Sequence, residues 1–313
     1  MSTHPAAGTT DDPYWRERSL AWRVAEDATE RAQPADDVVA AMIDRVIDNA
    51  AVSAAALRVL PVAAARGQAI PHGLQPGATV MGLERDVRVS PEWGAWANTV
   101  AVSHVDDADG PDSRARAAVP ALIAVAQHCE IAGADLLRGL TTVQALNHRA
   151  WEAEEAIGSG PESPPLAATV AAGIGAALDL PIETVFEAIL GTLHVREPAS
   201  IPAEAERWSH AAAFGGKRAI EEVDRAMRAE PGTPPGRRHD AARGGRRPDA
   251  RDLPGVETLE ALAYGMVSVA EQRRFVELAL SLPELPPGQL HGLTLTADAD
   301  ALALRQPRGI FDR

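Results

Sequence analysis

Three carboxylates crowd into four residues, Asp106-Asp107-Ala108-Asp109, and His104 lies two residues before them. Like charges this close repel one another, so burial would raise the pKa of at least one carboxyl group and suit it to acid–base work. His104 and His194, which is expected at a helix end, are the nearest titratable partners. The alternative interpretation is a solvated turn with structural histidines, and the spacing alone leaves both open.

Other common chemistries lack the residues that they need. The sequence has no HExxH, no GxSxG and a single cysteine, Cys129, so neither a zinc-protease motif nor an intrachain disulfide is available. Lys217 is the only lysine, and the stretch 214–217 (FGGK) lacks the spaced upstream glycine of a phosphate loop. Gly173 and Gly175 lie in an Ala-rich run, where close helix packing explains them better than nucleotide binding. We therefore expect no cofactor and no metal.

The composition predicts an all-α protein, a helical bundle. Apolar residues make up 46% of the 313 residues but aromatics only 4%, and alanine, the strongest helix former, dominates the apolar set. The net charge of −14 argues against nucleic acid as a partner. No run of 18 apolar residues is free of charge, and the first 14 residues show no signal-peptide pattern. These features indicate a cytoplasmic protein without a membrane partner.

Apolar periodicity and helix-breaking residues divide the chain into four parts. We expect a disordered tail over 1–13, a helical domain over 14–229, an Arg/Pro/Gly-rich linker over 230–255, and a C-terminal helix with a tail over 256–313 that docks on the helical domain. The predicted helices cover about 15–31, a stretch after Pro34, 91–105, 115–130, 133–157, 165–178, 181–195, 207–229 and 256–282. Residues 67–90 predict loops and one short strand. The six arginines of the linker suit either a solvated loop or an anion-binding patch.

Four pairs of stretches are distinctive when taken together. They are 77–83 (GATVMGL) with 90–98 (SPEWGAWAN), 124–127 (AVAQ) with 133–139 (GADLLRG), 214–217 (FGGK) with 223–228 (VDRAMR), and 293–296 (LTLT) with 309–312 (GIFD). They resemble segments of the MmgE/PrpD family, which includes 2-methylcitrate dehydratase. The likeness spans most of the chain and implies that family's helical domain.

The resemblance implies loss of water from 2-methylcitrate without a metal, and a relative in the family decarboxylates cis-aconitate. Such chemistry needs a base for a weakly acidic C–H, an acid for the departing hydroxide, and cations for the carboxylates. The family resemblance would supply an Asp-rich loop ending in Thr, a His-Pro after it, a second His, a Lys, and a lid domain with further basic residues.

This chain departs from that pattern at several positions. Asp106 matches the first Asp of the loop, but Gly110 stands at the Thr position and Arg114 at the His-Pro position. Pro165 or Leu166 replaces the second His, and the region of the Lys falls near Trp208. The linker 230–255 lies where the lid should be and is too short to fold as a domain. We therefore expect a degenerate active site without the small lid domain.

Three functions remain open at this point. The chain is a hydro-lyase with a rebuilt site, a repurposed small-molecule catalyst such as a biosynthetic cyclase or lyase, or a non-catalytic partner of a full-length relative. Joint loss of several catalytic groups argues against the first function, because catalytic groups that act together lose most of their effect when any one of them is missing. The ligand is expected to be a small carboxylate, and the chain a homodimer or the hetero-partner of a relative. The candidate catalytic residues are Asp106, His104 and His194, and the candidate substrate-binding residues are Asp109, Arg114 and Asn98.

Overall fold

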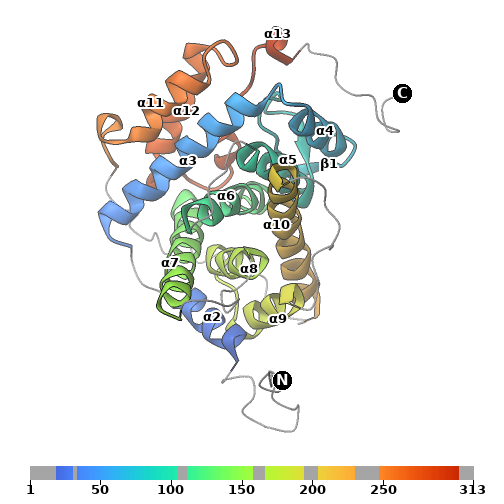
Figure 1. Ribbon diagram of the computed structural model, residues 1–313, viewed down its shortest axis with the longest axis vertical. Coiled ribbons are helices and arrows are strands. Elements are labelled where there is room, and N and C mark those ends of the chain that lie inside the picture. Colours follow the sequence, from blue (N-terminus) through green and yellow to red (C-terminus); the bar gives the residue numbers. More distant parts are fainter. Residues whose placement is uncertain are drawn as a thin grey trace.

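The computed structural model describes residues 19–30, 34–104, 111–157, 166–193, 204–229 and 247–302. The chain folds into packed helices, and a two-stranded antiparallel sheet is the only sheet within the described residues (Figure 1). The helices are α2 (Leu20–Thr29), α3 (Asp36–Ala56), α4 (Leu60–Ala69), α5 (Pro91–Ser103), α6 (Pro111–His128), α7 (Gly133–Ile157), α8 (Leu166–Ala177), α9 (Ile182–Leu193), α10 (Glu204–Ala229), α11 (Pro254–Leu262), α12 (Val269–Leu280) and α13 (Ala299–Leu302). The strands are β1 (Gly73–Thr79) and β2 (Arg88–Val89). The all-α prediction is confirmed.

Helix α8 forms the centre of the bundle. Figure 1 shows it surrounded by α2, α6, α7, α9 and α10, and each of these helices packs against it. Small residues allow this close approach. A Cβ added to Gly173 of α8 would lie 2.4 Å from Val143 Cγ2 of α7, and one added to Gly175 would lie 2.5 Å from Val185 Cγ2 of α9. The packing interpretation of the α8 glycines is therefore confirmed.

Helix α3 buries an apolar stripe, and its C-terminal end contacts a buried arginine of α4. The stripe residues are all below 4% exposed: Val39, Met42, Ile43, Val46 and Ile47. At the other end of α3, Arg66 is 2% exposed, and both its Nη1 and Nη2 donate to the Leu57 carbonyl at 3.3 Å. Burial lowers the pKa of Arg66. The negative end of the α3 dipole offsets the cost of burying this cation.

The chain after residue 246 differs from the sequence prediction. A single helix was predicted over 256–282, but α11 and α12 are separate, because Gly265 adopts a left-handed φ of 72° and Ser268 caps the start of α12. The predicted linker was also too long at its end, since α11 begins at Pro254 and Asp44 of α3 accepts a 2.7 Å hydrogen bond from Gly255 N. Helix α11 packs on α3, which docks this segment on the main bundle. The predicted tail 1–13 and residues 230–246 lie outside the described residues.

Residues 60–90 also contain more regular structure than the sequence indicated. No helix was assigned to 60–69, yet α4 forms there with Pro61 in its first turn, where proline is tolerated. One short strand was predicted, and two are present, with β1 bulged between Gly73 and Ala78. Beyond β1, Gly82 forms a parallel bridge to Thr296. The C-terminal segment therefore extends this small β-layer.

A buried carboxamide joins three distant parts of the chain. Gln127 Oε1 of α6 accepts hydrogen bonds from Thr79 N at 2.8 Å and Thr79 Oγ1 at 3.0 Å, and its Nε2 donates to the Leu290 carbonyl at 3.0 Å. Thr79 Oγ1 also bonds the Thr294 hydroxyl. These polar groups satisfy one another out of contact with water, so they fix β1 and residues 290–294 on α6.

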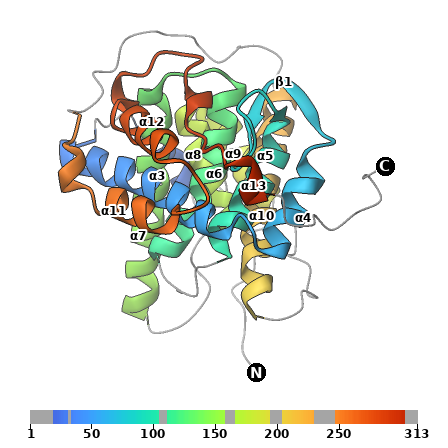
Figure 2. The same ribbon diagram turned by 90° about the horizontal axis from the view of Figure 1, so that it is seen from above.

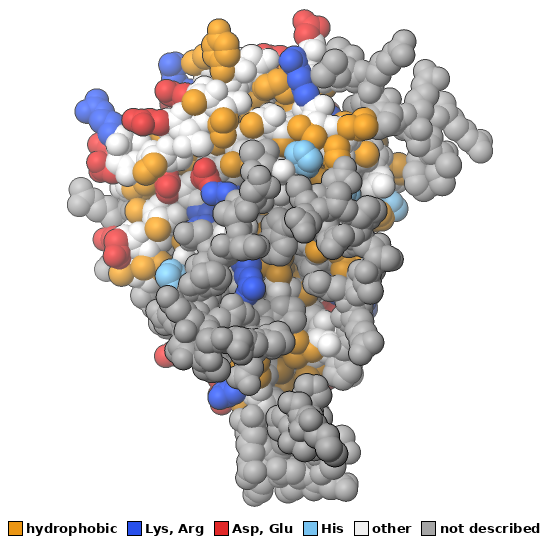
Figure 3. Space-filling model, viewed as in Figure 1, with side chains coloured by type: hydrophobic (Ala, Val, Ile, Leu, Met, Phe, Trp, Pro, Cys, Tyr) orange, Lys and Arg blue, Asp and Glu red, His pale blue; other side chains and the backbone are white. Residues whose placement is uncertain are grey.

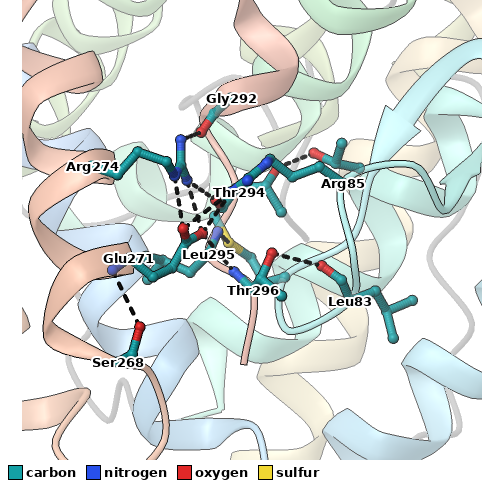
Figure 4. Close-up of polar contacts among 11 residues, drawn as sticks. Leu83, Arg85, Ser268, Glu271, Arg274, Gly292, Thr294, Leu295 and Thr296 are labelled. Carbon is teal, nitrogen blue, oxygen red and sulfur yellow. Dashed lines mark hydrogen bonds and ion pairs between the residues drawn. The ribbon is translucent and has the colours of Figure 1, made fainter. Parts of the chain in front are cut away.

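A second polar cluster holds α12 on the same segment (Figure 4). Arg85 Nη1 donates to both carboxylate oxygens of Glu271, at 2.9 and 3.1 Å, and Arg274 donates to them through Nε at 2.8 Å and Nη2 at 2.9 Å. Arg274 reaches the Gly292 and Thr294 carbonyls as well. Thr296 N completes the set at 3.0 Å from Glu271 Oε1. Glu271 thus connects α12, the loop after β1 and the C-terminal segment.

The Glu271 cluster predicts a loss of stability in acid. Burial acts to raise the pKa of Glu271, but the hydrogen bonds from Arg274, Thr296 and Arg85 outweigh it and hold the pKa below its ordinary value of 4.5. This stabilisation is present above pH 4.5 and is lost as pH falls through the lowered pKa. We expect Glu271→Gln to lower the unfolding free energy by about 2 kcal/mol at pH 7. In urea titrations, the difference in unfolding free energy between wild type and Glu271→Gln should become smaller below pH 4.5.

The matched control is Asp224→Asn. Asp224 pairs with Arg228 on the surface, where the two side chains are 58% and 76% exposed, so its loss should leave the unfolding free energy almost unchanged. A difference in unfolding free energy between wild type and Glu271→Gln that stays constant from pH 7 down to pH 3 would contradict the account of Glu271.

Candidate functional site

Helix α5 carries the candidate site. Pro91 occupies its first turn and Glu92 places a carboxylate there, as favoured at a helix start. The helix packs between α4, α6 and α10, and every residue over 97–103 is buried. The buried body of α5 therefore holds its last residues in a fixed position at the point where the chain leaves toward Asp106.

His104 lies at that end of α5, directly after the last helical residue. The side chain is half-buried, and its Nδ1 is out of contact with solvent without a hydrogen-bond partner in the described structure. A buried ring nitrogen without a partner is uncommon in native proteins, and it leaves this nitrogen available to a ligand or a water. Of the predicted catalytic residues, His104 is the one that the structure places.

Asn98, predicted to bind substrate, is committed to the fold. Its Oδ1 accepts from Met81 N at 2.8 Å and its Nδ2 donates to the Thr79 carbonyl at 3.0 Å. The side chain is 8% exposed. These two hydrogen bonds fix the end of β1 on α5. They assign the carboxamide a structural role, and its contact with a substrate stays a prediction.

Arg114 lies in the first turns of α6 and is half-buried. It and His104 stand on either side of the connection between α5 and α6. A guanidinium at this position is suited to bidentate binding of a carboxylate. The other predicted site residues, Asp106, Asp109 and His194, lie outside the described residues, and their roles stay predictions.

The end of α7 and the beginning of α10 project from one side of the molecule (Figure 2). According to the resemblance, the second histidine of the family would precede α8 and its lysine would lie near the beginning of α10. The positions where this chain departs from the family therefore flank helices that project together.

Lys217, the only lysine of the chain, lies near the Trp93 end of α5 and not at the His104 end. Lys217 Nζ is 4.8 Å from the centre of the Trp93 ring and 2.5 Å from Glu221 Oε1. His72 stacks on Trp93 at a centroid distance of 4.2 Å. Trp93 precedes His104 by eleven residues of α5, or about 16 Å at the α-helical rise. The Lys217 amine is thus engaged near the other end of α5.

The sequence analysis missed four buried polar groups on α3 and α5. Thr99 and Ser103 of α5 and Asn49 and Ser53 of α3 each have a buried oxygen that makes no hydrogen bond in the described structure. Each pair is spaced four residues apart, which places both members on one helix face. That spacing was visible in the sequence, but the lack of partners was not.

The model of the MmgE/PrpD N-terminal domain family matches residues 18–245, which is more than half of the chain. The chain belongs to the MmgE/PrpD family. The matched range includes every helix from α2 to α10. Residues that carried the resemblance also meet in space, because Thr79, Asn98, Gln127 and Thr294 are joined by the hydrogen bonds described above. In this MmgE/PrpD chain, residues of the stretches 77–83, 90–98, 124–127 and 293–296 are therefore joined in one hydrogen-bonded network.

Because Asn98 supports β1, its loss should destabilise the protein. Asn98→Ala leaves the Met81 N–H and the Thr79 carbonyl unpaired in a buried place, so we expect the unfolding free energy to fall by about 2–3 kcal/mol. Chemical denaturation measures this directly. An unchanged midpoint in Asn98→Ala would contradict the structural role and return Asn98 to the predicted substrate contacts.

Proposed function

We propose that this MmgE/PrpD-family chain binds a small carboxylate at the His104 end of α5, and that dehydration of 2-methylcitrate is lost or redirected in it. Support comes from His104, whose half-buried ring has an unpartnered Nδ1 and could accept or donate a proton. Arg114 adds a cation with carboxylate-binding geometry on the other side of the α5–α6 connection. Together they suit recognition of an acid.

The observation that carries the proposal is the position of Lys217. Dehydration of a tricarboxylate needs several cations as well as a base and an acid. The sole lysine is paired with Glu221 and lies over Trp93, so it does not supply an amine near His104. Arg114 is no substitute as a proton-transfer group, because a guanidinium stays protonated near neutral pH.

The charge of the described surface gives little help to a trianion. Figure 3 shows basic side chains interspersed with acidic and apolar ones over the described part of one face. The net charge of −14 opposes a multiply charged anion at long range. Binding therefore depends on short-range groups, and a redirected substrate would carry fewer charges than 2-methylcitrate. Within the described residues, no single helix is long and apolar enough to cross a membrane.

The decisive assay follows alkene formation from 2-methylcitrate. We expect no enzyme-like turnover, because the family comparison implies that several catalytic groups are missing. Acid–base groups typically contribute about 10²–10⁴-fold each to the rate and oriented donors about 10²–10³-fold. The matched variant is Asp106→Asn. Clear turnover by wild type that disappears in Asp106→Asn would show a rebuilt site and overturn the proposed loss.

We also propose that the chain self-associates. Apolar side chains are exposed at Leu60, Tyr264 and Val269, at 62%, 87% and 68%. Burying such side chains against another chain would remove apolar surface from water, which favours association. Light scattering at micromolar concentration should give about twice the 33.0 kDa chain mass. A mass of one chain would contradict self-association and favour a hetero-partner.

A further inference from the structure

Arg66 of α4 is a buried cation that has no carboxylate partner within the described residues. Only 2% of the residue is exposed. Burial lowers the pKa of Arg66, and no charged neighbour among the described residues acts against that shift. A buried charge without a partner of opposite sign strongly destabilises a folded protein, because the charge has lost its hydration. Native proteins therefore pair such charges or bind an ion to them.

One edge of the Arg66 guanidinium group lacks an acceptor. The group carries five N–H donors in a planar fork. Nη1 and Nη2 both donate to the Leu57 carbonyl at 3.3 Å, so that carbonyl lies at the end of the fork. Nε is out of contact with solvent and makes no hydrogen bond in the part of the chain that the structure describes. The Nε–H and the neighbouring Nη–H point in parallel, and this edge of a guanidinium group binds anions through two hydrogen bonds.

The Leu57 carbonyl neutralises only part of the charge of Arg66. It lies at the C-terminal end of α3, where the helix dipole is equivalent to about half a negative charge. Gly82 is another neighbour, since a Cβ added there would lie 3.6 Å from Arg66 Nη1. Its N–H already donates to the Leu295 carbonyl at 2.8 Å, and its carbonyl accepts from Ala297 N at 3.3 Å. About half of the positive charge is therefore left for a further negative group.

We propose that Arg66 binds a monovalent inorganic anion, chloride, in the corner between α3, α4 and the loop after β1. Chloride carries the negative charge that a water lacks, and it only accepts hydrogen bonds, which suits an edge that only donates. A single-atom anion also needs the least space in a closely packed interior, whereas sulfate and phosphate are larger. Through Arg66, the bound anion holds the end of α3 and the loop at Gly82 on α4.

This anion site is separate from the proposed carboxylate site. Gln68, two residues after Arg66, accepts a 3.0 Å hydrogen bond from Trp96 Nε1 of α5. Trp96 precedes His104 by eight residues, or about 12 Å at the α-helical rise. Arg66 therefore lies beside the first half of α5, and loss of its anion should change stability without removing a ligand from His104.

Scanning fluorimetry on the full chain would compare the Tm in sodium chloride with the Tm in sodium methanesulfonate. Both salts are used at the same ionic strength, so the difference reports chloride binding and not general screening. An anion that binds only the folded chain, at about a hundred times its dissociation constant, should raise the Tm of wild type by about 5 °C. Arg66→Met should remove this difference between the two salts, because the donor edge is lost.

Arg58→Met is the matched control. Arg58 follows the same end of α3 and its Nε donates to the Ala301 carbonyl at 3.0 Å, but the residue is exposed. This variant should keep the chloride-dependent rise in Tm. Each variant is compared with itself in the two salts, so a change in its overall stability does not affect the result.

A crystal of wild type grown in sodium bromide gives a second test that needs no variant. Bromide replaces chloride and is located by its anomalous scattering, and we expect it within hydrogen-bonding distance of Arg66 Nε. Two results would overturn the proposal. One is a chloride-dependent rise in Tm that persists in Arg66→Met or is absent from wild type. The other is a crystal in which a water or a carboxylate of the chain, and not bromide, contacts Arg66 Nε.

Discussion

The rest of the structure depends on the buried carboxamide of Gln127. It satisfies the backbone and hydroxyl of Thr79 on one side and the Leu290 carbonyl on the other, so α6, β1 and the C-terminal segment are fixed relative to one another. The end of β1 then engages Asn98, which positions α5. The place of His104 at the end of α5 follows from this series of buried hydrogen bonds. The matched family range ends at residue 245, yet the segment that completes this support lies beyond it.

Much of the fold could be predicted from sequence, because its helices are long and periodic. The α3 stripe, α7 and α10 follow directly from apolar spacing and helix-breaking residues. The break between α11 and α12 could not be predicted, since the apolar pattern continues across it. The left-handed backbone of Gly265 depends on tertiary packing, which the sequence pattern does not show. The role of Asn98 was equally hidden, because a motif shows which residue is present and not which backbone groups it satisfies.

The functional account depends on where two side chains lie along α5. His104 lies directly after the buried end of the helix, whereas the sole lysine is held over Trp93 near the other end of that helix. Arg114, in the first turns of α6, is the described cation that lies nearest to His104 in the sequence. The site that we propose therefore suits recognition of an acid better than dehydration of a tricarboxylate, which needs several cations together with a base and an acid.

Urea denaturation of Gln127→Leu tests this account most directly. The account predicts that the free energy of unfolding falls by about 2–3 kcal/mol, because the Thr79 N–H and the Leu290 carbonyl lose their buried partner. A free energy of unfolding equal to that of wild type would contradict it.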